Sequence, residues 1–172
     1  MTGGGLPSAL AGLVLAGALA ALAIAEPAAS VTGHAYAVDG DTVRVGGSPV
    51  RLFGVDAPES RQRCLDASAR SWACGEAATA ALRGMLARDP QVTCVVRDTD
   101  GDGRTVAVCA NREGDLGARR GALGMAVIVE KYGGIIYKDE QDAAKQEKIG
   151  VWQGDFQMPY LWRKTHAGSA RH

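Results

Sequence analysis

The sequence has no net charge: its 172 residues include 19 basic and 19 acidic side chains, and the three histidines count as neutral. The chain as a whole therefore has no general electrostatic attraction to polyanions. Nucleic-acid binding would have to depend on a local cluster of basic residues. Neighbouring basic residues occur at Arg61/Arg63, Arg119/Arg120 and Arg163/Lys164. Such pairs are also common on solvated surfaces, so none of them alone indicates a binding site.

Charged side chains are also absent from residues 6–25, which are rich in Leu, Ala, Val, Gly and Ile. This run ends in Ala-Ile-Ala before Glu26, the small-residue pattern of a secretory cleavage site. It has no Lys or Arg ahead of it, and its length of about twenty residues also suits an uncleaved anchor. We predict a signal peptide or N-terminal anchor at 1–25, with the mature N-terminus at Glu26 after cleavage. The domain is then periplasmic or secreted, or is held at the membrane by the uncleaved segment.

CxxC pairs are absent, and the histidines lie near the chain ends, so a zinc site is disfavoured. In an exported chain the four cysteines predict two disulfides, for which three pairings exist. Cys94 and Cys109 lie in two strand-like segments joined by the polar turn DTDGDG, so a bond between them would cross-link a hairpin. Cys64 and Cys74 would then close the short loop between them. We predict these two pairings.

Repeats and low-complexity linkers are absent after the leader, which favours one globular domain with its own core. Alternating apolar residues predict strands at 32–38, 41–45, 49–55, 91–97 and 104–111, and an extended segment at 126–129. Helical spacing predicts helices at 74–88, near 116–123 and around 140–148.

These elements predict an α+β fold, a five-stranded OB-type Greek-key β-barrel with about three packed helices. The barrel domain is expected at 32–152, after a short linker at 26–31. An aromatic and then basic tail is expected at 153–172, with its aromatic residues packed on the barrel and its basic end exposed.

Two carboxylates, Asp39 and Asp41, precede a strand in VDGDTVRV. Asp-Gly at a strand end is usual turn chemistry, which would explain both residues without any site. A two-residue turn at Gly47-Ser48, however, would place Asp41 opposite Gly54, beside the exit of the next strand. The same register pairs Arg51 with Arg44 and directs Arg51 away from Asp41, unless a bulge or barrel coiling brings it round.

The loop GVDAPES after that strand brings two further carboxylates, Asp56 and Glu59, to the same barrel edge as Asp41. Three such groups repel one another and raise each other's pKa, so they indicate a compensating hard cation with oxygen ligands. Arg51 and Arg104 are the basic residues expected nearby.

The motifs VDGDTVRV, VRLFGVDAPES, the Gly-Arg of DGDGRTVAV and KIGVW follow one another in this chain. Together they resemble the staphylococcal nuclease-like (thermonuclease) domain family over roughly residues 32–152. The resemblance implies a monomeric nuclease that hydrolyses the phosphodiester bonds of DNA or RNA with Ca²⁺. It implies that the Asp41 and Asp56 side chains and the Thr42 backbone carbonyl hold the calcium ion. It further implies that Glu59 positions or deprotonates the attacking water, and that Arg51 and Arg104 bind the phosphate.

The chain departs from the family pattern at two places. Before Gly-Arg it has Gly101 and Asp102 where a basic and an aromatic residue are usual, which should weaken phosphate binding. At 126–129 it lacks the family's tyrosine near the nucleotide base, although Tyr132 would substitute if the alignment shifts.

The acidic stretch DTDGDGR also resembles the first half of an EF-hand calcium loop. Its twelfth position is Cys109 rather than Glu, and strands rather than helices flank it, so an acidic hairpin turn is favoured.

Two function classes remain. The first is an exported calcium-dependent nuclease, which the complete set of three carboxylates and two arginines favours because phosphodiester cleavage uses such groups. The second is a non-catalytic OB-fold module that binds nucleic acid or protein.

Overall fold

The computed structural model describes residue 1 and residues 28–166. The predicted cleavage site and, apart from Met1, the predicted leader lie outside the described residues, as does the end of the basic tail. In the described part of the chain, no helix has the length and apolarity needed to cross a membrane.

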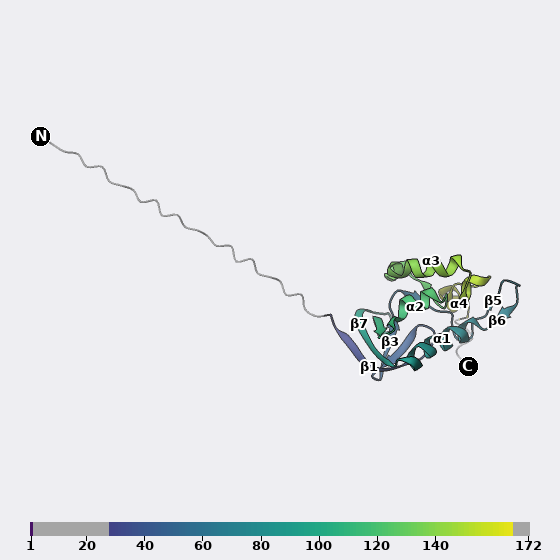
Figure 1. Ribbon diagram of the computed structural model, residues 1–172, viewed down its shortest axis with the longest axis horizontal. Coiled ribbons are helices and arrows are strands. Elements are labelled where there is room, and N and C mark those ends of the chain that lie inside the picture. Colours follow the sequence, from purple (N-terminus) through teal and green to yellow (C-terminus); the bar gives the residue numbers. More distant parts are fainter. Residues whose placement is uncertain (2–27, 167–172) are drawn as a thin grey trace.

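Five strands form a closed barrel (Figure 1). They are β1 (Ser30–Ala37), β2 (Thr42–Val45), β3 (Ser48–Leu52), β7 (Gln91–Thr99) and β8 (Thr105–Asn111). Neighbours pair antiparallel in the order β3-β2-β1-β7-β8, and a parallel pairing between β3 and β8 closes the barrel. This mixed topology confirms the predicted five-stranded OB-type barrel.

Short strand pairs complete the fold around the barrel. Strand β4 (Val55–Asp56) pairs with β10 (Val127–Ile128), and β5 (Cys64–Leu65) pairs with β6 (Ser71–Trp72). Strand β9 (Gly114–Asp115) pairs antiparallel with the end of β8. The β4–β10 pairing sets Asp56 directly opposite Val127. It therefore fixes the backbone of a predicted site residue at the barrel edge.

Within residues 28–166, four α-helices pack on this framework, against about three predicted. They are α1 (Cys74–Arg88), α2 (Leu116–Ala122), α3 (Lys138–Gln146) and α4 (Pro159–His166). Short 3₁₀ helices occur at η1 (Glu130–Tyr132), η2 (Gly134–Tyr137) and η3 (Gly150–Gln153). Helix α1 has the predicted bounds, whereas α4 lies in the segment 153–172, for which no helix was predicted.

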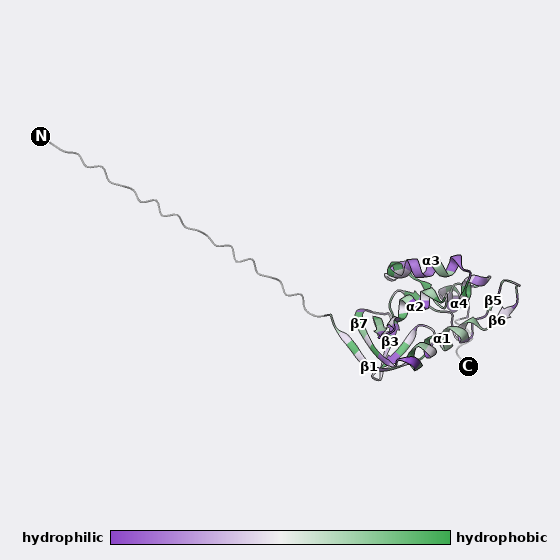
Figure 2. Ribbon diagram, in the orientation of Figure 1, coloured by the Kyte–Doolittle hydropathy of each residue, from purple (hydrophilic) through white to green (hydrophobic). Residues whose placement is uncertain are grey.

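The core lies between the barrel strands and helices α1 and α2. Val43, Val50 and Leu52 from the barrel pack with apolar residues of α1 such as Leu82 and Met85. Figure 2 shows the contrast with α3, which is largely hydrophilic and lies at the outside of the molecule.

The β2–β3 hairpin differs from its predicted register by two residues. Its turn is at Gly46 and Gly47, both with positive φ (56° and 89°), as a tight hairpin turn requires. Val43 therefore pairs with Val50, and Arg51 pairs with Thr42 rather than with Arg44. The predicted turn at Gly47-Ser48 is wrong. A shift of two residues leaves Arg51 on the same face of β3, but it makes Thr42, the residue next to Asp41, the direct partner of Arg51.

Both predicted disulfides are confirmed. Cys94 and Cys109 pair directly across β7 and β8, and Cys64–Cys74 closes the loop before α1. The backbone of Glu59 packs closely against Gly75 in the first turn of α1. A Cβ atom added to Gly75 would lie only 1.7 Å from the Glu59 carbonyl oxygen. The second disulfide therefore cross-links the segment that carries Glu59 to the start of α1.

Replacing both Cys64 and Cys74 by Ala is expected to lower the free energy of unfolding by about 2–3 kcal/mol, because the unfolded chain regains the entropy of a short closed loop. Urea unfolding of the oxidised variant and wild type measures the difference. Reduced wild type, which lacks both disulfides, should lose at least as much. A variant as stable as wild type would show that this cross-link does not stabilise the domain.

Candidate active site

Asp39 and Asp41 have different roles in the turn before β2. The Oδ1 atom of Asp39 accepts hydrogen bonds from the backbone N–H groups of Asp41 (3.0 Å) and Thr42 (2.8 Å), as a turn-forming carboxylate does. Asp41 is held through its carbonyl oxygen, which accepts from Leu52 N–H (2.8 Å). Its side chain is thereby free for the site.

The Asp41 carboxylate is buried, with the residue 5% exposed. Its Oδ1 accepts from the Thr42 hydroxyl (3.2 Å) and from Arg51 (2.9 Å), and its Oδ2 accepts from Ala57 N–H (3.0 Å). Burial raises the pKa of Asp41 to about 6, although the Arg51 cation acts in the opposite direction. A carboxylate held in this way is stabilised in its charged form by a nearby cation.

Arg51 joins Asp41 to the second buried carboxylate, Asp56. One guanidinium nitrogen donates to Asp41 Oδ1 and the other to Asp56 Oδ1, each at 2.9 Å. Burial lowers the pKa of Arg51, but the two carboxylates outweigh it and the net shift is upward. The predicted grouping of these three side chains is therefore present in the structure.

Arg163 of α4 enters the same cluster. Its Nη1 lies 2.8 Å from Asp56 Oδ1 and 2.6 Å from Glu59 Oε1, and its Nη2 lies 3.0 Å from Asp56 Oδ2. Burial would lower the pKa of Arg163, yet its hydrogen bonds to Asp56 and Glu59 raise it. We expected Arg163 to lie in an exposed basic segment and gave it no role in the site; its side chain is 41% exposed but its guanidinium is paired within the cluster. The only sequence signal was its place in one of three basic pairs.

The Thr42 carbonyl, predicted as a calcium ligand, is engaged elsewhere. It accepts from the backbone N–H groups of Val38 (2.9 Å) and Asp39 (3.4 Å), inside the turn. Thr42 contributes to the cluster through its hydroxyl, which donates to Asp41. This arrangement argues against the carbonyl as a ligand.

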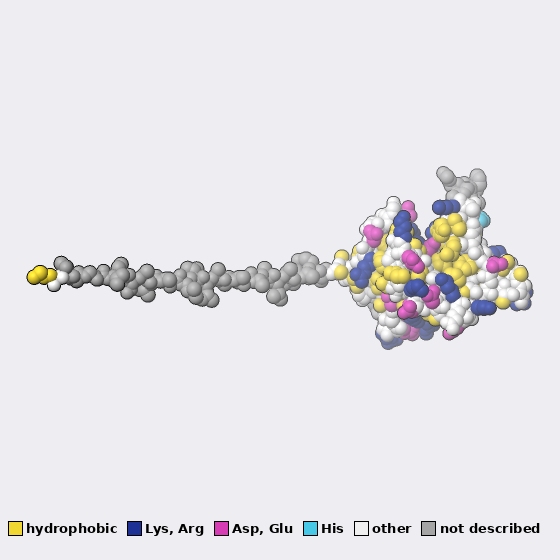
Figure 3. Space-filling model, turned by 90° about the horizontal axis from the view of Figure 1, so that it is seen from above, with side chains coloured by type: hydrophobic (Ala, Val, Ile, Leu, Met, Phe, Trp, Pro, Cys, Tyr) yellow, Lys and Arg dark blue, Asp and Glu magenta, His cyan; other side chains and the backbone are white. Residues whose placement is uncertain are grey.

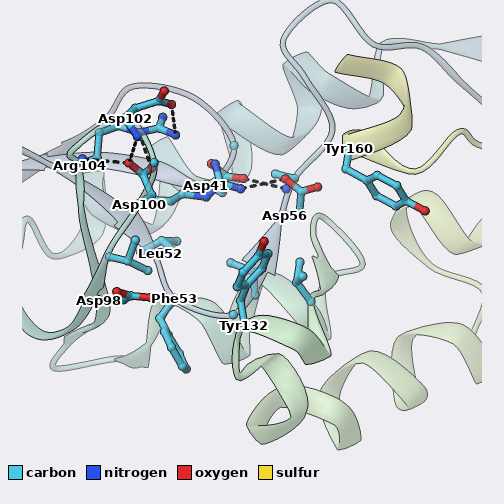
Figure 4. Close-up of a pocket in the computed structure, with 18 of the residues that line it drawn as sticks. Asp41, Leu52, Phe53, Asp56, Asp98, Asp100, Asp102, Arg104, Tyr132 and Tyr160 are labelled. Carbon is cyan, nitrogen blue, oxygen red and sulfur yellow. Dashed lines mark hydrogen bonds and ion pairs between the residues drawn. The ribbon is translucent and has the colours of Figure 1, made fainter. Parts of the chain in front are cut away.

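Arg104 is not in contact with the buried carboxylates. Figure 4 shows it paired with Asp100 and Asp102 in the turn between β7 and β8. Its Nε donates to Asp100 (2.8 Å), whose Oδ1 also accepts from the backbone N–H groups of Asp102 and Arg104. The acidic stretch therefore forms the favoured hairpin turn, and its carboxylates neutralise the second predicted phosphate-binding arginine.

Residues 49–154 match the family model described as Staphylococcal nuclease homologue. The chain belongs to the staphylococcal nuclease family. The chain is also 32% identical over 105 residues to "Succinoglycan biosynthesis protein ExoI" of Rhizobium meliloti (strain 1021). That similarity covers 60% of this chain and 55% of ExoI, so the chain spans little more than half of this relative's length.

The family match contains Arg51, Asp56, Glu59 and Arg104 and leaves out Asp41 and Arg163. In this nuclease-family domain the turn between the remaining barrel strands β1 and β2 supplies Asp41, and α4 supplies Arg163. The cluster is thus assembled from both ends of the described chain.

A cavity of about 1180 Å³ contains the whole cluster and extends to Arg104. Seven carboxylates and six basic side chains line it. Figure 3 likewise shows acidic and basic side chains intermixed with hydrophobic ones on one face of the molecule. The cavity therefore has no strong positive charge, and binding of a polyanion there requires an additional cation.

Two tyrosines line the cavity on different sides of Asp56, Tyr132 from η1 and Tyr160 from α4 (Figure 4). They are 60% and 47% exposed, so their rings are available for stacking. Trp152 and the tail residue Phe156 instead make an edge contact at 5.1 Å and pack beside Val151. The predicted packing of the tail aromatics thus describes Phe156 but not Tyr160.

Arg120 lies beneath the site. It is fully buried and donates to the carbonyl oxygens of Ala78 and Met125, each at 2.7 Å. Burial lowers its pKa to about 10, partly offset by Asp41 and Asp39. Arg120 is therefore an internal counter-charge for the acidic turn and does not belong to a surface basic cluster.

The donor set of the cluster suits calcium, because Asp41 and Asp56 present close carboxylate oxygens to one cavity. Among the described residues, however, no group of three His, Cys, Asp or Glu side chains is arranged as a metal site. Arg51 bridges Asp41 and Asp56, and Arg163 contacts Asp56, so the two guanidinium groups already donate to oxygens that a cation would use.

Proposed function

We propose that this protein is an exported calcium-dependent nuclease that hydrolyses phosphodiester bonds of DNA and RNA. The observation that carries the proposal is the pair of buried carboxylates, Asp41 and Asp56, bridged by Arg51 at the floor of a cavity with Glu59 at its edge. Family membership supports the same class of reaction.

In this proposal Asp41 and Asp56 hold the calcium ion, which when bound would polarise a phosphoryl oxygen. Glu59 orients and deprotonates the attacking water, a role for which its 34% exposed side chain is accessible. Arg51 uses only some of its five donors on Asp41 and Asp56, so others remain for the developing charge on phosphate. Arg104 would have to leave Asp100 and Asp102 to do the same, so we expect it to contribute less than Arg51.

The two disulfides are compatible with a protein that folds in an oxidising compartment. We propose that the domain acts as a monomer in the periplasm or outside the cell, after cleavage before Glu26. Retention of residues 1–25 would instead anchor it to the membrane.

A second candidate is a non-catalytic module that binds nucleic acid or protein. Two observations favour it: the carboxylates of the cluster are paired with arginines, and the relative ExoI is described as a biosynthesis protein.

Labelled single-stranded DNA and RNA, incubated with calcium and with excess chelator, distinguish the two candidates. The nuclease proposal expects cleavage with calcium and loss of cleavage with chelator. Binding without cleavage under all conditions would support the second candidate.

Replacing Asp41 by Asn is expected to weaken calcium binding by about 10–100-fold, because one charged oxygen ligand is lost. Cleavage should recover in part at high calcium. Calorimetric calcium titration measures the change.

Asp39→Asn is the matched control, since it removes the same charge two residues away while its amide oxygen still accepts the turn's hydrogen bonds. It should bind calcium much as wild type does. Equal effects of the two substitutions would remove Asp41 from the ligand set.

A further inference from the structure

Arg163, from helix α4 outside the barrel, binds two carboxylates of the acidic cluster formed by Asp41, Asp56 and Glu59. Its guanidinium contacts both oxygens of Asp56 and one oxygen of Glu59. The segment before α4 is also held to the Glu59 loop independently, because the buried Gln62 side chain donates to the Gln157 carbonyl and accepts from Glu59 N–H. Helix α4 is thus placed at the site by contacts other than Arg163 itself.

The position of Arg163 conflicts with metal binding by the same carboxylates. Asp56 Oδ2 accepts from Arg163, and Oδ1 accepts from both Arg51 and Arg163. An incoming cation therefore has to displace a guanidinium from Asp56. Arg163 is the one that leaves more easily, since its side chain is 41% exposed, whereas that of Arg51 is 21% exposed and also paired with Asp41.

The net charge of the cluster indicates which kind of group Arg163 can pair with once a cation has displaced it from Asp56 and Glu59. Three carboxylates and two arginines carry one net negative charge, and a divalent cation changes this to one net positive charge. One phosphodiester group balances that charge. With a metal ion on the carboxylates, Arg163 would therefore be a donor without its present partners, while Arg104 has Asp100 and Asp102 as partners.

We propose that Arg163 exchanges partners during the reaction cycle: it pairs with Asp56 and Glu59 in the metal-free site and turns to the substrate phosphate when calcium is bound. This inference rests on the proposed function and adds a phosphate-binding residue to it. It makes calcium and phosphate binding mutually reinforcing through one side chain.

Calcium titration of the substrate-free protein tests the first half. Arg163→Ala should bind calcium about tenfold more tightly than wild type, because no guanidinium has to be displaced. Arg163→Lys, which keeps the charge but not the planar fork, should fall between the two. Lys164→Ala is the matched control, since it removes one positive charge from the neighbouring position of α4 and should change the affinity less than about twofold. Weaker calcium binding by Arg163→Ala would overturn the exchange.

Binding of thymidine 5′-monophosphate, with and without calcium, tests the second half. Wild type should bind the nucleotide about 5–150-fold more tightly at saturating calcium, the usual range for coupled sites. In Arg163→Ala this enhancement should fall by about tenfold, because the donor released by calcium is missing. An undiminished enhancement would show that Arg163 never reaches the phosphate.

Both titrations measure binding, so they give an answer even if wild type cleaves neither DNA nor RNA. In that case the proposed function fails while the partner exchange is still judged by its own results. If wild type does cleave, Arg163→Ala should lower kcat by about 10²–10³ at saturating calcium, as loss of a transition-state donor does. Wild-type kcat in this variant would overturn the phosphate role.

Discussion

Replacing Glu59 by Gln is expected to lower turnover on single-stranded DNA by about 10²–10⁴-fold, the range for loss of a positioned general base. Gln keeps an amide oxygen that accepts from Arg163, so the geometry of the loop is preserved while the basic oxygen is lost. Calcium affinity should change little, because Asp41 and Asp56 remain. Nuclease rates and calcium titrations on the same preparations separate the two effects.

Glu113→Gln provides the matched control. Glu113 pairs with Arg88 and Arg119, outside the cavity, so its neutralisation should leave turnover at the wild-type level. Full activity of Glu59→Gln would exclude Glu59 as the base and require a different catalytic group.

Replacing Arg120 by Leu is expected to lower the free energy of unfolding by about 3–5 kcal/mol, as does removal of one partner from a buried polar cluster. The carbonyl oxygens of Ala78 and Met125 would lose their donors, and Asp41 would lose a nearby positive charge. Urea unfolding monitored by tryptophan fluorescence and by circular dichroism measures the loss.

The neighbouring Arg119→Leu is the comparison. Arg119 forms a partly exposed ion pair with Glu113 at 2.6 Å, so its loss should cost about 1 kcal/mol or less. If the two variants unfold at the same urea concentration, Arg120 does not have the structural role assigned to it.

The parts of the fold that were predicted correctly depend on local patterns. The alternation of apolar residues located the five barrel strands, and the helical spacing of apolar residues located α1. The disulfide pairing followed from the hairpin that brings Cys94 and Cys109 together. The hairpin register was missed because Gly46-Gly47 and Gly47-Ser48 are both acceptable two-residue turns in the sequence. The structure selects the first, in which both turn residues are glycines with positive φ.

The site was predicted in part, for a similar reason. Asp41 and Asp56 come together through neighbouring strands, so short-range pairing was enough to group them, whereas the predicted register turned Arg51 away from Asp41. Arg163 and Glu59 are 104 residues apart, and no periodicity connects them. Arg104 lies where expected along the chain, but its pairing with Asp100 depends on side-chain geometry within the turn.

The position of Asp41 and Arg163 at opposite ends of the described chain has a consequence for any shortened version of this protein. A fragment trimmed to the family match at 49–154 would keep Asp56 and Glu59 but would lose two barrel strands, one carboxylate and one arginine. The unit that folds and the unit that assembles the charged cluster are therefore both longer than the segment that the family model matches. Expression boundaries for this domain should extend from before Ser30 to beyond His166.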